Sequence, residues 1–228
     1  MKKLLLFIAL FVAIAANAQS NFDFGPKLGY QSSYISRSEY DETAISSGSV
    51  TFGVFGRFEY NNIIIQPEIM YSGYSFKLSL YNNGMMLDAR NHSIAVPVLV
   101  GYKFYDNDFL NLRANVGPVM YFGFSDTFKF AGEKIDLNND AVSYVLEPWT
   151  HSPVSLGLAL NIGVDIERFT LDFTYSKGLT DVFRDGELLF EDYVFDYIPY
   201  KQNVFSFTLG YNRKHNPRTA VLHHGRHL

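Results

Sequence analysis

Acidic and basic side chains embedded in apolar segments are the residues of this sequence best placed to do chemistry. In SLGLALNIGVDIERFTLDFTY, residues 155–175, Asn161, Asp165 and Asp172 lie among leucine, isoleucine, valine and phenylalanine. Charges in such surroundings are tolerated only when they are paired, so they could form a buried ion-pair network or a path for protons or ions. The candidate set is Lys27, Arg57, Glu59, Glu68, Lys103, Arg113, Asp165 and Asp172.

Two Ser–His neighbours are a second candidate for chemistry. His92 precedes Ser93, and His151 precedes Ser152. A serine nucleophile needs a histidine base within hydrogen-bonding distance and an acid to orient that base. Acyl transfer is therefore an alternative, but such neighbours are common in a serine-rich chain. We expect no catalytic residues and a protein that is not an enzyme.

Histidines also gather in the last residues of the chain. A His-rich tract can bind a metal ion, but no acidic ligand accompanies these residues at a spacing typical of a defined site. We therefore predict no metal and no cofactor, and a disordered tail over 213–228. Cysteine is absent, which excludes a disulfide framework, a thiol nucleophile and a lipid-anchor cysteine. The tail histidines are His215, His223, His224 and His227.

The N-terminus has the pattern of a secretory signal peptide. Two lysines are followed by 12 apolar residues, too few to span about 30 Å of hydrocarbon as a helix. Ala16 and Ala18 then supply the small-x-small pattern that precedes cleavage, so we predict cleavage before Gln19 and a signal peptide over 1–18. Without those two of the 19 Lys and Arg residues, the 23 acidic residues exceed the basic ones by six. Such acidity argues against nucleic-acid binding.

Alternation with a period of two is the main structural signal. In 154–166 every even residue is large and apolar, and every odd residue is small or polar. Successive side chains of a strand point to opposite faces, so the pattern predicts a strand with one apolar and one polar face. Similar patterns predict eight strands in all. They lie at about 22–36, 50–60, 63–76, 92–104, 110–124, 154–166, 169–176 and 205–212.

The connections between these strands alternate in length. Tight turns are expected at 61–62, 105–108 and 167–168, and long polar loops at 37–48, 77–91, 125–152 and 181–201. Short turns at one end and long loops at the other are typical of a bacterial outer-membrane barrel. A soluble lipocalin-like barrel is the alternative, but its large apolar residues point inward. The sequence therefore predicts an all-β fold, an eight-stranded antiparallel up-and-down transmembrane β-barrel over 19–212.

The polar face of these strands is expected to fill the barrel. An eight-stranded barrel is just wide enough for side chains to occupy its interior. We therefore interpret the eight charged candidates as a paired network that plugs the lumen, with a proton or ion path as the alternative. Aromatic residues near strand ends are expected to form interface girdles. They are Tyr30, Tyr60, Tyr71, Tyr102, Phe104, Phe169, Tyr175 and Tyr211.

Five blocks of the sequence carry a family resemblance. They are IIIQPEIMYSG (63–73), SIAVPVLVGYKF (93–104), NVGPVMYF (115–122), LGLALNIGVDIERFTLDFTYSKGLTDVF (156–183) and NVFSFTLGYN (203–212). In this order they resemble the PorT-like outer-membrane β-barrel family of Bacteroidetes. The resemblance implies a small barrel in the outer membrane and no single activity; one member of the family serves protein secretion in gliding bacteria.

The expected function follows from the class of protein. We expect an integral, Sec-exported outer-membrane protein that supports the envelope, or that binds a surface or periplasmic protein through its long acidic and aromatic loops. Its expected partners are outer-membrane lipid and lipopolysaccharide, and an envelope protein contacted by loops 125–152 and 181–201. A component of a secretion or translocation assembly and an outer-leaflet lipid-modifying enzyme are the alternatives.

Overall fold

The fold was analysed in a computed structural model of the chain. It describes residues 22–37, 43–44, 46–80, 85–107, 109–130, 133–134, 152–181, 188–190, 193–195 and 200–213. The signal-peptide residues Ala16, Ala18 and Gln19, and the tail histidines, lie outside these described residues.

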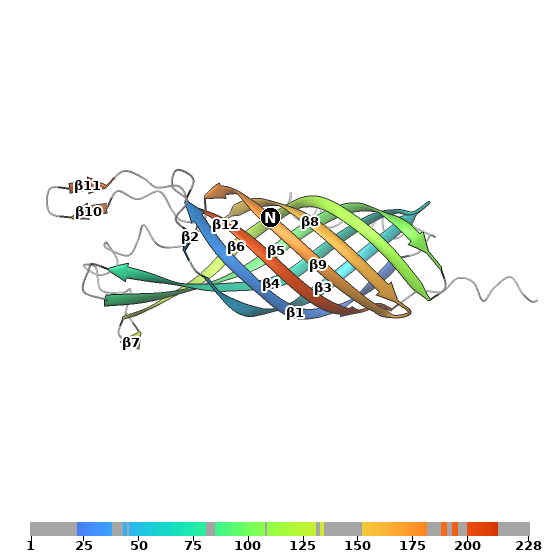
Figure 1. Cartoon of the computed structure of the whole chain (residues 1–228), viewed down its shortest axis with the longest axis horizontal. Coiled ribbons are helices and arrows are strands. Elements are labelled where there is room, and N and C mark those ends of the chain that lie inside the picture. Colours follow the sequence, from blue (N-terminus) through green and yellow to red (C-terminus); the bar gives the residue numbers. More distant parts are fainter. Residues whose placement is uncertain are drawn as a thin grey trace, which may run out of the picture.

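Eight long antiparallel strands close into a barrel (Figure 1). Each strand pairs with its neighbour along the chain, and the last strand returns to the first, where Tyr30 lies opposite Phe207. The predicted eight-stranded up-and-down barrel is therefore confirmed. The barrel strands are β1 (Phe22–Arg37), β3 (Ser46–Tyr60), β4 (Ile63–Leu80), β5 (Met85–Asp106), β6 (Leu110–Phe130), β8 (Ser155–Ile166), β9 (Phe169–Asp181) and β12 (Tyr200–Tyr211).

Tight turns and long connections lie at opposite ends of this barrel (Figure 1). Asn61 and Asn62 both have a positive φ, of 47° and 68°, which a two-residue hairpin turn requires and which asparagine tolerates. Glu167, with a φ of 51°, opens the turn between β8 and β9. We name the end with these turns the turn end and the opposite end the loop end.

The strands continue further toward the loop end than the sequence predicted. β4 reaches Leu80 and β5 begins at Met85, so the expectation of a loop over 77–91 is wrong, as is that of a loop over 125–130. Backbone pairing persists there although the strict apolar and polar alternation of the sequence stops. Sequence periodicity therefore underestimates these strands.

Four short strands lie within the segments expected to be loops. β2 (Thr43–Ala44) pairs with β1, and β7 (Glu133–Lys134) pairs with the end of β6. β10 (Leu188–Phe190) and β11 (Tyr193–Phe195) form a separate hairpin within 181–201. The parts of the four predicted loops that lie outside the described residues are 38–42, 45, 81–84, 131–132, 135–151, 182–187, 191–192 and 196–199.

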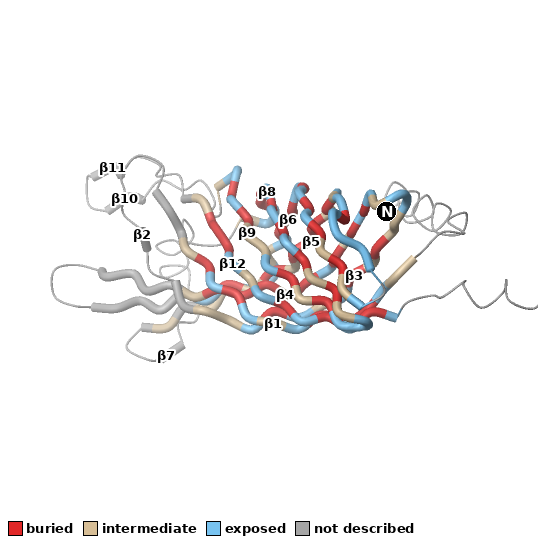
Figure 2. The backbone as a smooth tube through the Cα atoms, turned by 45° about the vertical axis from the view of Figure 1, so that its right-hand side comes forward, coloured by how far each residue is buried: buried red, intermediate tan, exposed pale blue. Residues whose placement is uncertain are grey.

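The apolar face of the strands points away from the barrel interior. Along β8, Leu160 and Ile162 are 55% and 62% exposed, whereas Asn161 between them is 2% exposed. Buried and exposed positions alternate in the same way along the other strands (Figure 2). A lipocalin-like barrel has the opposite polarity, so this arrangement suits lipid outside the barrel. No helix in the part of the chain that the structure describes is long and apolar enough to cross a membrane.

The aromatic residues expected at the membrane interfaces lie on this outer face. Tyr71 and Tyr175 are half-buried because neighbouring rings cover them: Tyr71 stacks on Phe52 with ring centroids 5.0 Å apart, and Tyr175 packs on Phe205 at 4.7 Å. The other predicted girdle residues are exposed. Their position on the outer face is compatible with interface girdles, which remain a prediction. These exposed residues are Tyr30, Tyr60, Tyr102, Phe104, Phe169 and Tyr211.

Glycine allows close approach at several inward positions. A Cβ added at Gly117 would collide with the carbonyl group of Val98 on the neighbouring strand, and one at Gly163 would collide with the guanidinium of Arg113. The small residues of the inner face therefore make room for backbone and for long side chains.

Substitution of Gly117 by alanine should destabilise the barrel. The added methyl must displace backbone on β5, and overpacking of this kind costs about 1–3 kcal/mol. Gly56→Ala is the matched control, because its Cβ would meet the ring of Phe22 at 3.3 Å on the outer face. Urea unfolding of the refolded variants in lipid vesicles measures the difference. Equal stability of the two variants would contradict the close approach.

Candidate functional site

Six of the eight predicted charged residues meet inside the barrel. Each is an inward residue of its strand, and strand pairing brings the residues to one level. Basic and acidic members come from different strands, which lets each charge face an opposite one. They are Lys27 on β1, Arg57 on β3, Glu68 on β4, Arg113 on β6, Asp165 on β8 and Asp172 on β9.

Arg113 is the central residue of this group, with 0% of its surface exposed. Its Nη2 lies 2.5 Å from Oδ1 of Asp172, and its Nε lies 3.3 Å from Oδ2 of Asp165. The same guanidinium donates to Oδ1 of Asn161 at 3.1 Å and to Oγ1 of Thr170 at 2.6 Å. The planar fork of arginine suits it to join two carboxylates and two neutral acceptors at once.

The contacts of the other charged residues close a ring. Lys27 Nζ lies 2.6 Å from Oδ2 of Asp172 and 2.5 Å from Oε1 of Glu68. On the other side of Arg113, Asp165 pairs with Arg57 through Oδ2 and Nη1 at 2.9 Å.

Gln66 completes the circuit. It accepts from Nε of Arg57 at 2.8 Å and donates from Nε2 to Oε1 of Glu68 at 2.5 Å. We name these seven residues the charge ring: Lys27, Arg57, Gln66, Glu68, Arg113, Asp165 and Asp172. Three cations face three carboxylates in it, so its formal charge is zero. Gln66 was absent from the predicted set, although it is an inward residue of the weakly alternating segment 63–76.

Glu59 and Lys103 form a separate pair closer to the turn end. Lys103 Nζ lies 2.5 Å from Oε1 of Glu59 and 3.6 Å from Oδ2 of Asp106, whose side chain is half exposed. This pair stands near water and does not join the charge ring through any ion pair among the described residues. The eight predicted residues are thus divided between two levels of the lumen.

An apolar layer lies above the charge ring, toward the loop end. Met70, Leu99, Val119 and Ala159 are buried in one cluster with Ala95, Tyr121 and Val204. The alternation of the sequence predicts small or polar residues at inward positions, so this layer differs from the prediction. In the sequence, this layer corresponds to the weak alternation of segments 63–76 and 92–104, where apolar residues occupy both faces of the strand.

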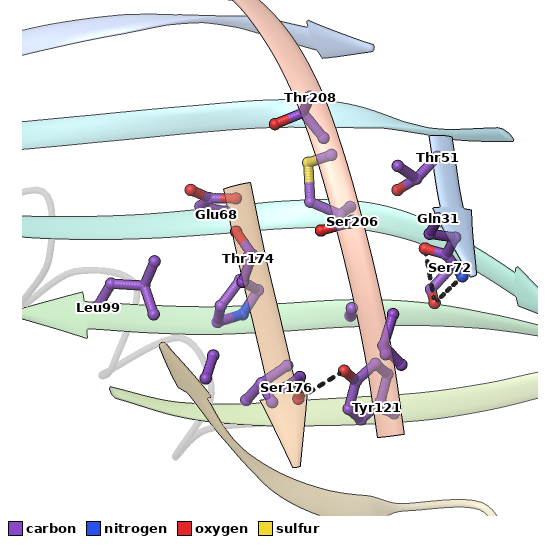
Figure 3. Close-up of a pocket in the computed structure, with 16 residues that line it drawn as sticks. Gln31, Thr51, Glu68, Ser72, Leu99, Tyr121, Thr174, Ser176, Ser206 and Thr208 are labelled. Carbon is purple, nitrogen blue, oxygen red and sulfur yellow. Dashed lines mark hydrogen bonds between the residues drawn. The ribbon is translucent and has the colours of Figure 1, made fainter. Parts of the chain in front are cut away.

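A cavity of about 60 Å³ lies in this layer (Figure 3). One wall is apolar and comes mainly from β5, β6 and β8. The facing wall carries hydroxyl and amide groups, including Gln31, Thr51 and Ser176. A cavity of this size has room for several water molecules. Glu68 of the charge ring also lines it, so the cavity rests directly on the ring.

The Ser–His neighbour at 92–93 does not form a catalytic pair. His92 points outward, where its Nδ1 lies 2.6 Å from the hydroxyl of Tyr71. Ser93 points inward and donates to the carbonyl oxygen of Ser72 at 2.9 Å. Adjacent residues of a strand face opposite sides, which separates the nucleophile from the base. His151 lies outside the described residues, and Ser152 donates to the carbonyl oxygen of Val154 at 3.2 Å.

A family model described as the outer membrane protein beta-barrel domain matches residues 17–184. The chain belongs to this family. It is an integral protein of the outer membrane. In such barrels the short turns are periplasmic and the long loops are extracellular, which identifies the turn end and the loop end.

Solved structures similar to this chain include two barrels of low sequence identity. Ail, the attachment invasion locus protein of Yersinia pestis, is 13% identical with a TM-score of 0.42, over 84% of this chain and 98% of that chain. Neisserial surface protein A is 12% identical with a TM-score of 0.43, over 82% and 96%. No curated protein matches this chain.

Substitution of Arg113 by methionine should be among the most damaging single changes in the lumen. It leaves Asp165 and Asp172 facing each other without their shared cation, and a broken buried ion pair costs about 3–5 kcal/mol. Lys103→Met is the matched control and should cost less, because its partners stand nearer to water. Urea unfolding of refolded protein measures both variants. A loss at Arg113 no larger than that at Lys103 would contradict the central position of Arg113.

Proposed function

We propose that the protein is a non-conducting outer-membrane barrel that is not an enzyme and that supports the envelope or binds a partner protein with its loop end. The observation that carries this proposal is the charge ring, which crosses the lumen from β1 to β9. Its ionic members are at most 8% exposed, and each contacts the next. An ion could pass only by displacing side chains whose charges are already paired.

The charge balance of the ring supports the same conclusion. Ion-selective pores carry rings of one sign, which attract the conducted ion. Here the three cations and three carboxylates cancel, so the ring offers no net charge to a passing ion. A compensated interior is what a structural plug needs, and we propose this role for the predicted lumen network instead of a proton path.

The loop end is the proposed working surface. β4, β5 and β6 run on as an extended ribbon at that end (Figure 1). The segments 125–152 and 181–201 are acidic and contain aromatic residues, which are common in protein interfaces. Most of these segments lies outside the described residues, so the partner proposal rests on their composition. Lipid and lipopolysaccharide are the proposed partners of the outer face, where aliphatic and aromatic side chains are exposed.

Assignment to the PorT-like barrels of Bacteroidetes is the finer form of this proposal. Support comes from the five sequence blocks, three of which lie wholly within strands of the barrel. A role in a protein secretion or translocation assembly is the corresponding second candidate. The outward His92 and inward Ser93 weigh against a lipid-modifying enzyme. We also keep the proposed processing, with a signal peptide over 1–18, the barrel over 19–212 and a tail over 213–228.

Planar-bilayer recordings test the plugged lumen. Refolded protein should insert without producing large, steady conductance, because the side chains of the charge ring fill the lumen at the level where they lie. Insertion is verified independently by the shift in gel mobility between heated and unheated samples. A large and steady current from inserted protein would contradict the proposal.

Loop replacement tests the working surface. Replacement of 182–199 by a short Gly-Ser linker should abolish capture of a partner in a pull-down from the native envelope. Replacement of 81–84 is the matched control, since it shortens a connection outside the two acidic loops. Unchanged capture by the 182–199 variant would count against an interaction role for this loop.

A further inference from the structure

We propose that the lumen cavity binds a small uncharged molecule that has an apolar body and one hydrogen-bonding group, and that this molecule enters from the membrane between β3 and β4. This site is separate from the proposed loop-end function. The proposal rests on the walls of the cavity, on the polar groups at its ends and on a β-bulge in the barrel wall beside it.

The two walls of the cavity differ in chemistry. Ala95, Leu99, Val119 and Ala159 supply an apolar wall. Hydroxyl and amide groups supply the facing wall, and most of them are labelled in Figure 3. A site for water alone does not need the apolar wall, and a site for a purely apolar molecule does not need the polar wall. The polar lining residues are Gln31, Thr51, Ser72, Thr174, Ser176, Ser206 and Thr208.

Polar side chains lie at both ends of the cavity. The charge ring lies on the periplasmic side. On the extracellular side the wall is polar: Gln202 donates to Oγ of Ser33 on the neighbouring strand at 3.4 Å, and Asn91 donates to Oδ1 of Asp126 on the neighbouring strand at 2.6 Å. Ser33, Asn91 and Gln202 are 1–3% exposed, as is Tyr74. Entry along the barrel axis would take an apolar molecule past buried polar groups at either end.

A β-bulge disrupts the ladder between β3 and β4 next to the cavity. The two strands are in register from Tyr60 and Ile63 up to Phe52 and Tyr71, and again at Ser47 and Ser75. Between these stretches the register shifts, and residues 48–51 have no ladder partner on β4, although all of 46–80 is described. We name this interruption the β3–β4 seam.

Side-chain hydrogen bonds cross this seam. Thr51 donates from Oγ1 to the carbonyl oxygen of Tyr71 at 2.6 Å. The carbonyl oxygen of Gly73 accepts from the hydroxyl of Ser49 and from Nε2 of Gln31, the latter at 2.8 Å. Side chains can rotate away without moving a strand, so these bonds are easier to release than a backbone ladder. Thr51 and Gln31 also line the cavity, which makes the seam part of its wall.

Aromatic rings border the seam on the lipid side. Phe52 and Tyr71 are the first pair in register beside the seam, and their rings stack at 5.0 Å. The hydroxyl of Tyr71 contacts Nδ1 of His92. Rotation of Tyr71 would remove this cover, so a molecule dissolved in the outer leaflet could reach the seam without passing through water.

The absence of cysteine makes the route measurable. Ala159→Cys places a single thiol on the apolar wall of the cavity. In lipid vesicles it is treated with methyl methanethiosulfonate, which is small and uncharged, or with the charged trimethylammonium-ethyl reagent of the same reactive group. We expect the uncharged reagent to modify the thiol and the charged one to leave it unmodified, as followed by mass spectrometry.

Variants of the seam and of the extracellular wall separate the two routes. In the Ala159→Cys background, Ser49→Ala with Thr51→Val should speed modification by roughly fivefold for each hydrogen bond removed. Gln202→Ala, the matched control in the extracellular wall, should leave the rate unchanged. Tyr71→Ala provides a second seam variant if the first does not fold, as judged by heat-dependent gel mobility. Modification by both reagents, acceleration by Gln202→Ala alone, or no modification by the uncharged reagent would each overturn the proposal.

Discussion

Compensation of charge inside a narrow barrel is the constraint on which the rest of this structure depends. Eight strands enclose a space that side chains must fill, and a charge in that space has neither bulk water nor lipid to stabilise it. The chain meets this requirement with three cations and three carboxylates in contact, which Gln66 joins into a closed ring. The small residue at Gly163, beside the guanidinium of Arg113, follows from the same requirement.

The sequence could predict the face on which these charges lie, because alternation along a strand requires only local information. It placed Asp165 and Asp172 inside the barrel, and both are buried there. It could not predict which charges pair, since Arg113 meets Asp165 and Asp172 through the registers of β6, β8 and β9. Gln66 closes the ring, but it is uncharged, and the candidate residues were selected by their charge.

Two further features could not be predicted from the sequence, for different physical reasons. Leu99 and Met70 are inward and apolar. They weaken the apolar and polar alternation of their strands, and this alternation was the signal that assigned residues to the inner face. The apolar layer could therefore not be predicted from it. At the loop end, β4 and β5 continue their backbone pairing without a periodic signal in the sequence. Local pattern therefore defines the membrane-spanning part of a strand better than its full length.

The lumen has three levels with different consequences for function. The charge ring lies on the periplasmic side, buried polar groups line the wall on the extracellular side, and an amphipathic cavity lies between them. The proposed working surfaces are therefore the loop end and the β3–β4 seam. A double-mutant cycle between Arg113 and Asp172, measured by unfolding in vesicles, tests the central claim most directly. The compensated ring predicts a coupling energy of about 0.5–3 kcal/mol, with the double variant less destabilised than the sum of the single variants; additive losses would contradict it.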